Sequence, residues 1–140
     1  MPDRYSSQHQ VRAYFTEFPG IYFTGIEGGA SVNEVTDQFP GGSPVPEQVT
    51  GPTTIEQVTL TKPFEPIADE PLQIWVRAWD AGGRKRLTLV KEYITSEGVP
   101  VGKQTRFMEC AKVSYKDPDF NRGSAEVANI TLIVKPRYIA

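Results

Sequence analysis

Only one segment of the chain has the apolar period of a helix. Asp69 is a suitable N-cap for it, Pro71 suits its first turn, and Gly82 and Gly83 follow as a stop signal. Its large apolar residues recur with the spacing of one helical face, at Leu72, Trp75, Val76 and Trp79. We therefore predict a single helix whose apolar stripe packs into the core against a sheet. A binding platform built from the two tryptophans is the less favoured alternative.

The remaining patterned segments alternate as strands do, or are rich in β-branched and aromatic residues. They cover residues 20–26, 30–37, 53–62, 87–95, 101–116 and 125–135. In the longest of them, Phe107, Ala111, Val113 and Tyr115 are expected to share one face, with Cys110 on the other. Helices do not alternate with these strands, so a parallel α/β fold is excluded. We predict one domain over residues 1–140, mainly β, with two packed antiparallel sheets in a sandwich-like or barrel-like arrangement and one flanking helix.

Two segments are predicted to lie outside this framework. Residues 1–12 are polar and without period, and are expected to form a flexible N-terminal arm. Proline and glycine fill seven of the fifteen positions in residues 38–52. Because proline removes backbone donors and glycine weakens strands, we predict a long loop over residues 38–53. Loops of this length often carry function, so an interaction loop is favoured over a passive connector.

The charges are unevenly distributed, although the net charge is only −2. Residues 1–65 carry eight acids and three bases, whereas residues 66–140 carry nine acids and twelve bases. The asymmetry is either accidental or a sign of head-to-tail assembly, in which an acidic surface of one copy meets a basic surface of the next. The small net charge predicts no strong affinity for nucleic acid.

No arrangement of residues points to catalysis, to a metal or to a cofactor. The single cysteine excludes an internal disulfide and a cysteine-based zinc site, and the single histidine, His9, argues against histidine-based transfer chemistry. Cys110 and His9 could form a nucleophile–base pair, but a cysteine that simply fills space in the core is favoured. Glu92 and Glu109 could form a catalytic carboxylate pair, but ordinary surface charges are favoured. We expect no enzyme activity. No signal peptide or membrane span is apparent, so synthesis in the cytoplasm is expected.

Three short motifs have ordinary interpretations that we prefer. Residues 117–121 resemble a fragment of a calcium loop but lack its twelve-residue spacing, and a solvated turn is favoured. The basic run 84–86 is too short for a nucleic-acid site. The sequon at Asn129 lies inside a predicted strand and is discounted.

The order of the segments resembles that of tail tube proteins of long-tailed bacteriophages, above all the contractile-tail kind. The similarity runs from the strand at 21–26, through Phe39-Pro40-Gly41-Gly42, to the strand at 55–62. It continues with a short helix that has an early leucine and tryptophan, Leu72 and Trp75, and ends in the strand at 131–134. Pro63 and the longer loop depart from the family pattern.

The resemblance implies a non-enzymatic subunit whose copies form rings, six to a ring, that stack into a hollow tube for DNA passage during ejection. Sheath, baseplate and tape-measure proteins would be its partners, and it would be assembled in the bacterial host cytoplasm and reside in the virion. Type VI secretion tubes and tail terminator or adaptor proteins are alternatives within the class, and a small-ligand-binding β-barrel is the alternative outside it.

Two sets of residues are assigned to such an assembly. Contacts between subunits or rings are expected in the proline- and glycine-rich loop, at Phe39, Pro40, Gly41, Gly42, Pro44, Pro46 and Gln48. Polar positions are expected to line the lumen, because a wall with few lysine and arginine side chains would let DNA slide without tight binding. These positions are Asn33, Glu34, Glu56, Gln57, Asn129 and Thr131.

Overall fold

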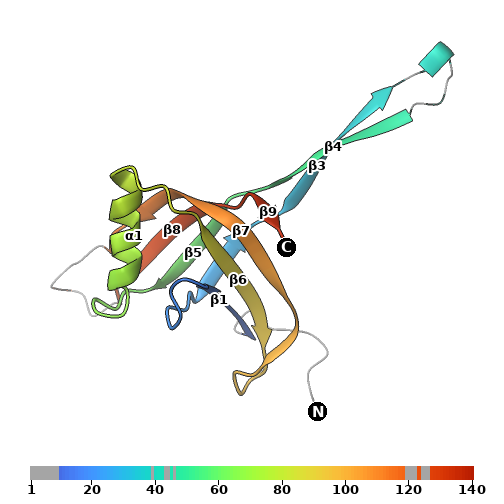
Figure 1. Cartoon of the computed structure of the whole chain (residues 1–140). Helices are drawn as coiled ribbons and strands as arrows, with labels where there is room; N and C mark the ends of the chain where they lie inside the picture. Colours follow the sequence, from blue (N-terminus) through green and yellow to red (C-terminus); the bar gives the residue numbers. More distant parts are fainter. Residues whose placement is uncertain (1–9, 39, 43–44, 46, 119–122, 124–126) are drawn as a thin grey trace.

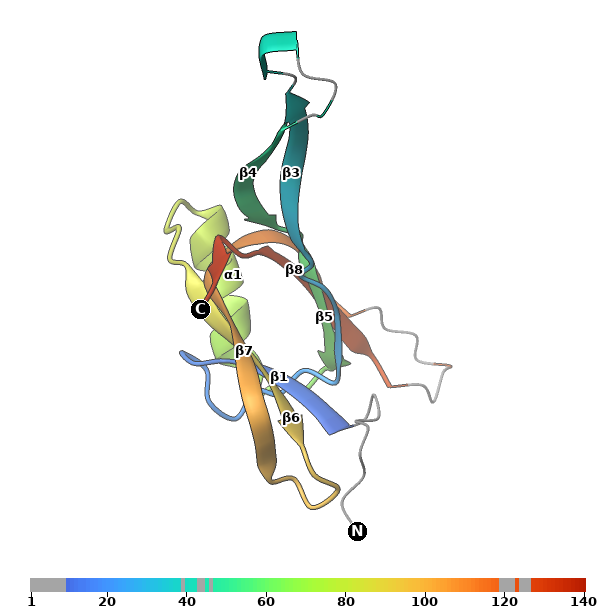
Figure 2. The same cartoon turned by 90° about the vertical axis from the view of Figure 1, so that its right-hand side faces the viewer.

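The chain folds into a β-rich body from which one long hairpin projects (Figures 1 and 2). The structure is a computed structural model that describes residues 10–38, 40–42, 45, 47–118, 123 and 127–140. Within these residues there are nine strands, one α-helix and a short 3-10 turn. In chain order they are β1 Val11–Phe15, β2 Gly25–Gly28, β3 Ser31–Gln38, η2 Pro40–Gly42, β4 Glu47–Ile55, β5 Val58–Pro63, α1 Glu70–Asp80, β6 Leu87–Ile94, β7 Pro100–Lys116, β8 Asn129–Lys135 and β9 Tyr138–Ile139.

The body is one antiparallel sheet of seven strands, in the order β1-β6-β7-β8-β5-β2, with β9 pairing alongside on β7. The strand β7 joins its two halves, because residues up to Cys110 pair with β6 and residues from Ala111 onward pair with β8. The outer ends of the sheet come together at a single antiparallel bridge, where the Phe23 amide donates to the Ala13 carbonyl over 2.8 Å. The two halves therefore face each other across a shared core, which confirms the predicted mainly β architecture with packed antiparallel sheets and one helix.

The core is built from inward-facing residues of both halves. β5 and β8 alternate buried with partly exposed positions, and Leu60 lies opposite Leu132 in their register. From the other half, Phe15 and Leu89 are fully buried in the same cluster. Burial of this kind supplies most of the stabilising free energy of a domain.

The predicted faces of the long strand were wrong, because β7 contains two irregularities. Glu109 has a left-handed backbone conformation with φ of 51°, and the register with β8 shifts between Lys112 and Ser114. Each irregularity reverses the alternation of side chains. Phe107 and Cys110 are consequently both buried, three residues apart, whereas Val113 is exposed.

The helix packs its apolar stripe onto the core beside β7. Leu72, Trp75 and Val76 are buried, and Trp79 is partly buried at the edge of the same cluster. The Trp75 ring lies 6.0 Å from the Phe15 ring between centroids, and its indole Nε1 donates to the Lys85 carbonyl over 2.8 Å. The helix is thus held to β1 by ring packing and to the segment before β6 by a hydrogen bond.

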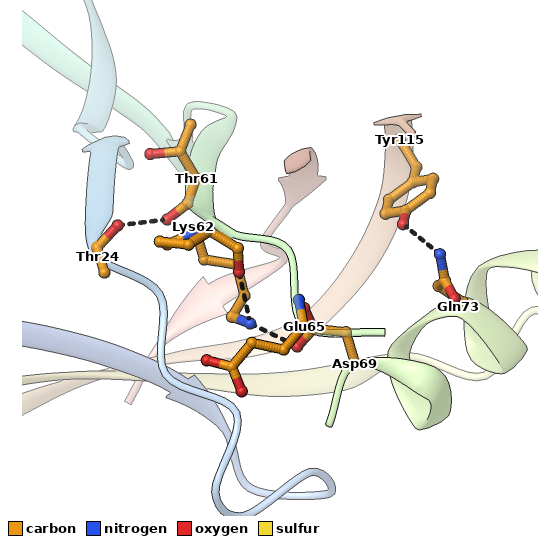
Figure 3. Close-up of polar contacts among 8 residues, drawn as sticks. Thr24, Thr61, Lys62, Glu65, Asp69, Gln73 and Tyr115 are labelled. Atoms are coloured by element: carbon orange, nitrogen blue, oxygen red, sulfur yellow. Dashed lines mark hydrogen bonds and ion pairs between the residues drawn. The ribbon is translucent and has the colours of Figure 1, made fainter. Parts of the chain in front are cut away.

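A buried ion pair fixes the start of the helix (Figure 3). Asp69 occupies the predicted N-cap position, but its side chain makes no capping bond. The carboxylate instead accepts from Lys62 Nζ over 2.5 Å and from the Glu65 amide over 2.9 Å, and Lys62 also donates to the Pro63 carbonyl. Both side chains are at most 4% exposed, so this pair ties the end of β5 to the first turn of α1 inside the protein.

Several predicted boundaries differ from the structure. Residues 47–53, expected in a long loop, belong to β4, and Val11 and Arg12, expected in the arm, begin β1. Pro52 is accommodated because it lies where the β3–β4 register shifts, on a ribbon whose outer edge needs no donor. The predicted strand over 53–62 is divided between β4 and β5, and β9 was not predicted.

The helix stripe can be tested by truncation. Replacing Trp75 by alanine removes a buried indole and its hydrogen bond, and should lower the free energy of unfolding by about 3–5 kcal/mol. Ile74→Ala, on the exposed face of the same helix, is the matched control and should change it by less than about 0.5 kcal/mol. Denaturant unfolding curves of both variants measure the difference. Equal effects would show that Trp75 does not anchor the helix.

The buried ion pair gives a second prediction. Lys62→Met leaves the Asp69 carboxylate buried without its cation, which should cost about 3–5 kcal/mol of unfolding free energy. The double variant Lys62→Met, Asp69→Asn removes the charge while keeping an acceptor for the Glu65 amide, so most of this loss should be recovered. Chemical denaturation of the two variants decides the point. A double variant less stable than Lys62→Met would contradict it.

Candidate assembly surfaces

The hairpin of β3 and β4 is a two-stranded sheet of its own that extends away from the body (Figures 1 and 2). Its strands pair from Ser31–Ile55 at the base to Gln38–Glu47 near the tip. Asn33 Nδ2 donates to Thr53 Oγ1 over 2.6 Å and braces the lower part of the ribbon. Neither face packs on the body along most of this length, since Val35 is 56% exposed and Val45 is 68% exposed.

The described members of the predicted interface set lie at the far end of this hairpin. Pro40, Gly41 and Gly42 form the turn η2, in which Gly41 has φ of 55° and nothing near the position that a Cβ would occupy. Gln48 is exposed on β4 opposite Asp37. Phe39, Pro44 and Pro46 lie outside the described residues. The structure therefore places the described members of this set on one projecting tip.

The predicted lumen residues do not form one surface. Asn33 and Glu34 lie on the hairpin, and Glu56 and Gln57 lie in the connection between β4 and β5. Asn129 and Thr131 lie instead on the outward face of β8, where Thr131 pairs with Thr61 of β5 and Lys116 of β7. Only these last two residues share a face of the body.

That outward face is rich in hydroxyl groups. Opposite the core, β5 presents Thr59 and Thr61, and the register sets Thr59 beside Ile133 and Thr61 beside Thr131. On the neighbouring strands it continues through Glu27 of β2 and through Ser114 and Lys116 of β7. The residues of this face are therefore mostly polar, with Ile133 as the apolar exception. Asn129 and Thr131 were predicted from the sequence as polar positions. The threonines of β5 were not, although their alternation with Val58 and Leu60 is the signal that predicts them.

The candidates for catalysis are not assembled. Cys110 is fully buried, and burial raises the pKa of its thiol to about 12, so the thiolate that nucleophilic chemistry needs is suppressed. His9 lies outside the described residues. Glu92 is buried in an ion pair with Arg12, whereas Glu109 pairs with Arg137 at 3.2 Å. The β6–β7 register places Leu87 opposite Cys110, the residue next to Glu109, and Glu92 lies five residues further along β6. The two glutamates are therefore not cross-strand neighbours.

The predicted turn over residues 117–121 is described only at its start, since residues 119–121 lie outside the described part. Within the described residues, no three histidine, cysteine, aspartate or glutamate side chains gather as metal ligands would. In the same residues no helix has the length and apolar character needed to cross a membrane.

A cleft lies at the base of the hairpin, against the end of β8, and the sequence analysis did not identify it. Its volume is about 510 Å³. Its lining residues are Thr53, Thr54, Ile55, Arg86, Lys135, Pro136 and Arg137. Three of these are cations that come from two segments far apart in the sequence, the start of β6 and the end of β8. The fold therefore creates a basic concavity next to the projecting ribbon.

No protein-family model matches the sequence, and no curated protein matches it. Several solved structures share the fold along almost its whole length. A chain from the sheath–tube complex of an extracellular contractile injection system (PVC) in the extended state has a TM-score of 0.82 at 13% identity, covering 99% of this chain and 91% of that one. A chain from the baseplate of the anti-feeding prophage has a TM-score of 0.75 at 19% identity, with 100% and 96% covered. A chain from the cap that terminates the tube of that prophage has a TM-score of 0.79 at 14% identity, with 100% and 93% covered.

These similarities establish that the chain has a fold found in contractile injection systems. The tail-tube-like architecture indicated by the sequence is confirmed at this level.

Proposed function

We propose that this chain is a structural subunit of the tube of a contractile tail, in which rings of identical copies stack into a hollow cylinder. The observation that carries the proposal is the full-length match of its fold to a chain of a sheath–tube complex. The baseplate that contains another similar chain is six-fold symmetrised, and we propose six copies to a ring. A protein of this kind acts through its contact surfaces. In agreement with this, Cys110, Glu92 and Glu109 are not brought together as the groups of a reactive centre would be.

The projecting hairpin supplies contacts between copies. An isolated two-stranded ribbon is marginally stable in water, and its free edges are templates for pairing with another chain. The valines exposed on this ribbon gain apolar burial when a neighbour covers them. The hairpin tip, with Pro40, Gly41, Gly42 and Gln48 and the adjoining Phe39, Pro44 and Pro46, is therefore the proposed interface between subunits or rings.

The hydroxyl-rich outward face of β5 and β8 is the proposed wall of the lumen. DNA binds proteins tightly where lysine and arginine neutralise its phosphates. Thr59, Thr61, Asn129 and Thr131 offer no positive charge, so a polyanion can slide past them. Asn129 and Thr131 are thus proposed lumen residues, as they are in the expectation from the sequence. The other expected lumen residues lie on the hairpin and at its base, and these are Asn33, Glu34, Glu56 and Gln57.

The wider context follows from the same proposal. The tube would contact sheath, baseplate and tape-measure proteins, pass genomic DNA during ejection without binding it tightly, and act without catalysis. It would assemble in the cytoplasm of the bacterial host and reside in the tail of the particle.

A cap or terminator is the second candidate, supported by the similarity to a chain of a tube-terminating cap. Such a protein forms a single ring and does not propagate. Negative-stain imaging of the purified chain separates the two roles, because a tube subunit gives cylinders of variable length and a cap gives only rings. A chain that stays monomeric at high concentration would refute both.

Removal of the hairpin tests its role directly. Replacing residues 33–53 by Asn-Gly joins Val32 to its cross-strand partner Thr54 through a tight turn. The body should keep its cooperative thermal transition, because the core cluster contains no residue between 33 and 53. Sedimentation should show at least a tenfold loss of assembly relative to the full chain. Normal assembly by the shortened chain would remove the hairpin from the interface.

A further inference from the structure

The hairpin is an acidic surface without compensating cations. Residues 31–55 contain Glu34, Asp37 and Glu47 and no lysine or arginine. All three acids are exposed, and among the described residues none of them forms an ion pair. Gln38 and Glu47 close the register at the tip, so the negative charge continues to the far end of the ribbon.

The cleft at the hairpin base has the opposite charge. Its rim carries Arg86, Lys135 and Arg137, while the buried residues Ile55 and Pro136 contribute apolar surface. Glu109 partly compensates these cations, because its carboxylate pairs with Arg137 and its carbonyl accepts from Arg86 Nη1 over 3.3 Å. Among the described residues, the side-chain ammonium of Lys135 forms no ion pair that would offset its charge. One carboxylate for three cations leaves the cleft with an excess of positive charge.

The acids near the hairpin tip cannot reach the cleft of their own chain. Asp37 is six residues beyond Ser31, which pairs with Ile55 beside the cleft. Six extended residues span roughly 20 Å, and exposed charges this far apart are largely screened at physiological ionic strength. In both views the hairpin points away from the body (Figures 1 and 2). An acid near the tip can therefore meet such a cleft only on another molecule.

We propose that this cationic cleft is the receptor for the acidic hairpin of a neighbouring copy of the chain. The inference rests on the proposed function and adds the place where the hairpin binds. The contact is heterologous, since hairpin and cleft are different surfaces of the subunit, and such contacts propagate into rings or filaments. The strand β3 spans roughly 26 Å, and the turn η2 lies beyond its end, so the hairpin of one copy is long enough to contact an adjacent copy.

The charges set the direction of assembly as well as its strength. Two hairpins repel each other, as do two clefts, so head-to-head contacts are disfavoured and only the head-to-tail order pairs opposite charges. This pairing accounts for part of the uneven charge distribution along the sequence. Three of the eight acids of residues 1–65 lie on the ribbon, and the cations of the receiving site come from residues 86–137.

Reciprocal charge reversal tests this assignment. One variant reverses the cleft with Lys135→Glu and Arg137→Glu, and a second reverses the hairpin with Glu34→Lys, Asp37→Lys and Glu47→Lys. Each alone places like charges in contact, so the concentration at which sedimentable assemblies appear should rise about tenfold or more. An equimolar mixture of the two should assemble as the wild type does, because each hairpin then finds a cleft of opposite charge.

Controls separate this effect from misfolding and from net charge. Thermal unfolding should show that each variant keeps a cooperative transition. The control variant Arg77→Glu with Lys103→Glu changes the net charge by the same amount as the cleft variant, at exposed positions outside the cleft. Any loss of assembly in this control should not be rescued by mixing it with the hairpin variant.

Each other outcome has a definite meaning. If the wild type assembles and the reversed variants assemble equally well, or if the mixture does not recover, the cleft is not the receptor while the proposed function stands. If cleft reversal leaves assembly intact but abolishes retention of a labelled duplex DNA, the cleft is a phosphate site and the inference is wrong. A wild-type chain that remains monomeric at every concentration overturns the proposed function and this inference with it.

Discussion

The domain depends on a single long strand that belongs to both halves of its sheet. β7 pairs with β6 over its first part and with β8 over its second, so the two faces of the core are covalently continuous through it. The left-handed conformation of Glu109 lies close to the junction, one residue before Cys110, where the pairing with β6 ends. The strands β6, β8 and β9 pair with β7, and α1 packs beside it. The remaining strands of the body, β1, β5 and β2, are joined to it through β6 and β8.

The body then serves as a rigid base for surfaces. The helix is fixed by the buried Lys62–Asp69 pair at its start and by Trp75 in its middle, which leaves its outer face exposed. The hydroxyl-rich face of β5 and β8 lies opposite the same core. The hairpin and the basic cleft meet at one edge of the body, where β4 ends and β8 is followed by Arg137. Acidic and basic surfaces on separate sites of one rigid unit are what head-to-tail assembly requires.

The sequence predicted those elements whose side-chain period is strong and uninterrupted. The helix was found because Leu72, Trp75 and Val76 mark a face, and β8 was found because Ile130, Leu132 and Val134 alternate with polar residues. β1 was missed because only Ala13 and Phe15 mark its buried face. The faces of β7 were mispredicted because a bulge at a glutamate has no signature in composition.

The assembly surfaces were only partly predictable. Pro52 and Gly51 predict a loop, since proline and glycine disfavour strands in the interior of a sheet. A free two-stranded ribbon tolerates both, because its outer edges require no partner and its register can shift at the proline. The cleft could not be predicted from the sequence, since Arg86 and Lys135 are far apart in the chain and come together only in the folded protein. The turn at the hairpin tip lies within the predicted loop, whereas residues 47–53 of that loop form part of the strand β4.

We propose that the hairpin is exposed in a single copy and becomes covered by another copy on assembly. Amide hydrogen exchange of peptides from residues 31–55, followed by mass spectrometry across a concentration series, measures this exposure. We expect rapid exchange of these amides in dilute protein and strong protection once assemblies form, with the core strands β5 and β8 protected throughout. Assemblies in which residues 31–55 exchange as fast as they do in the monomer would contradict it.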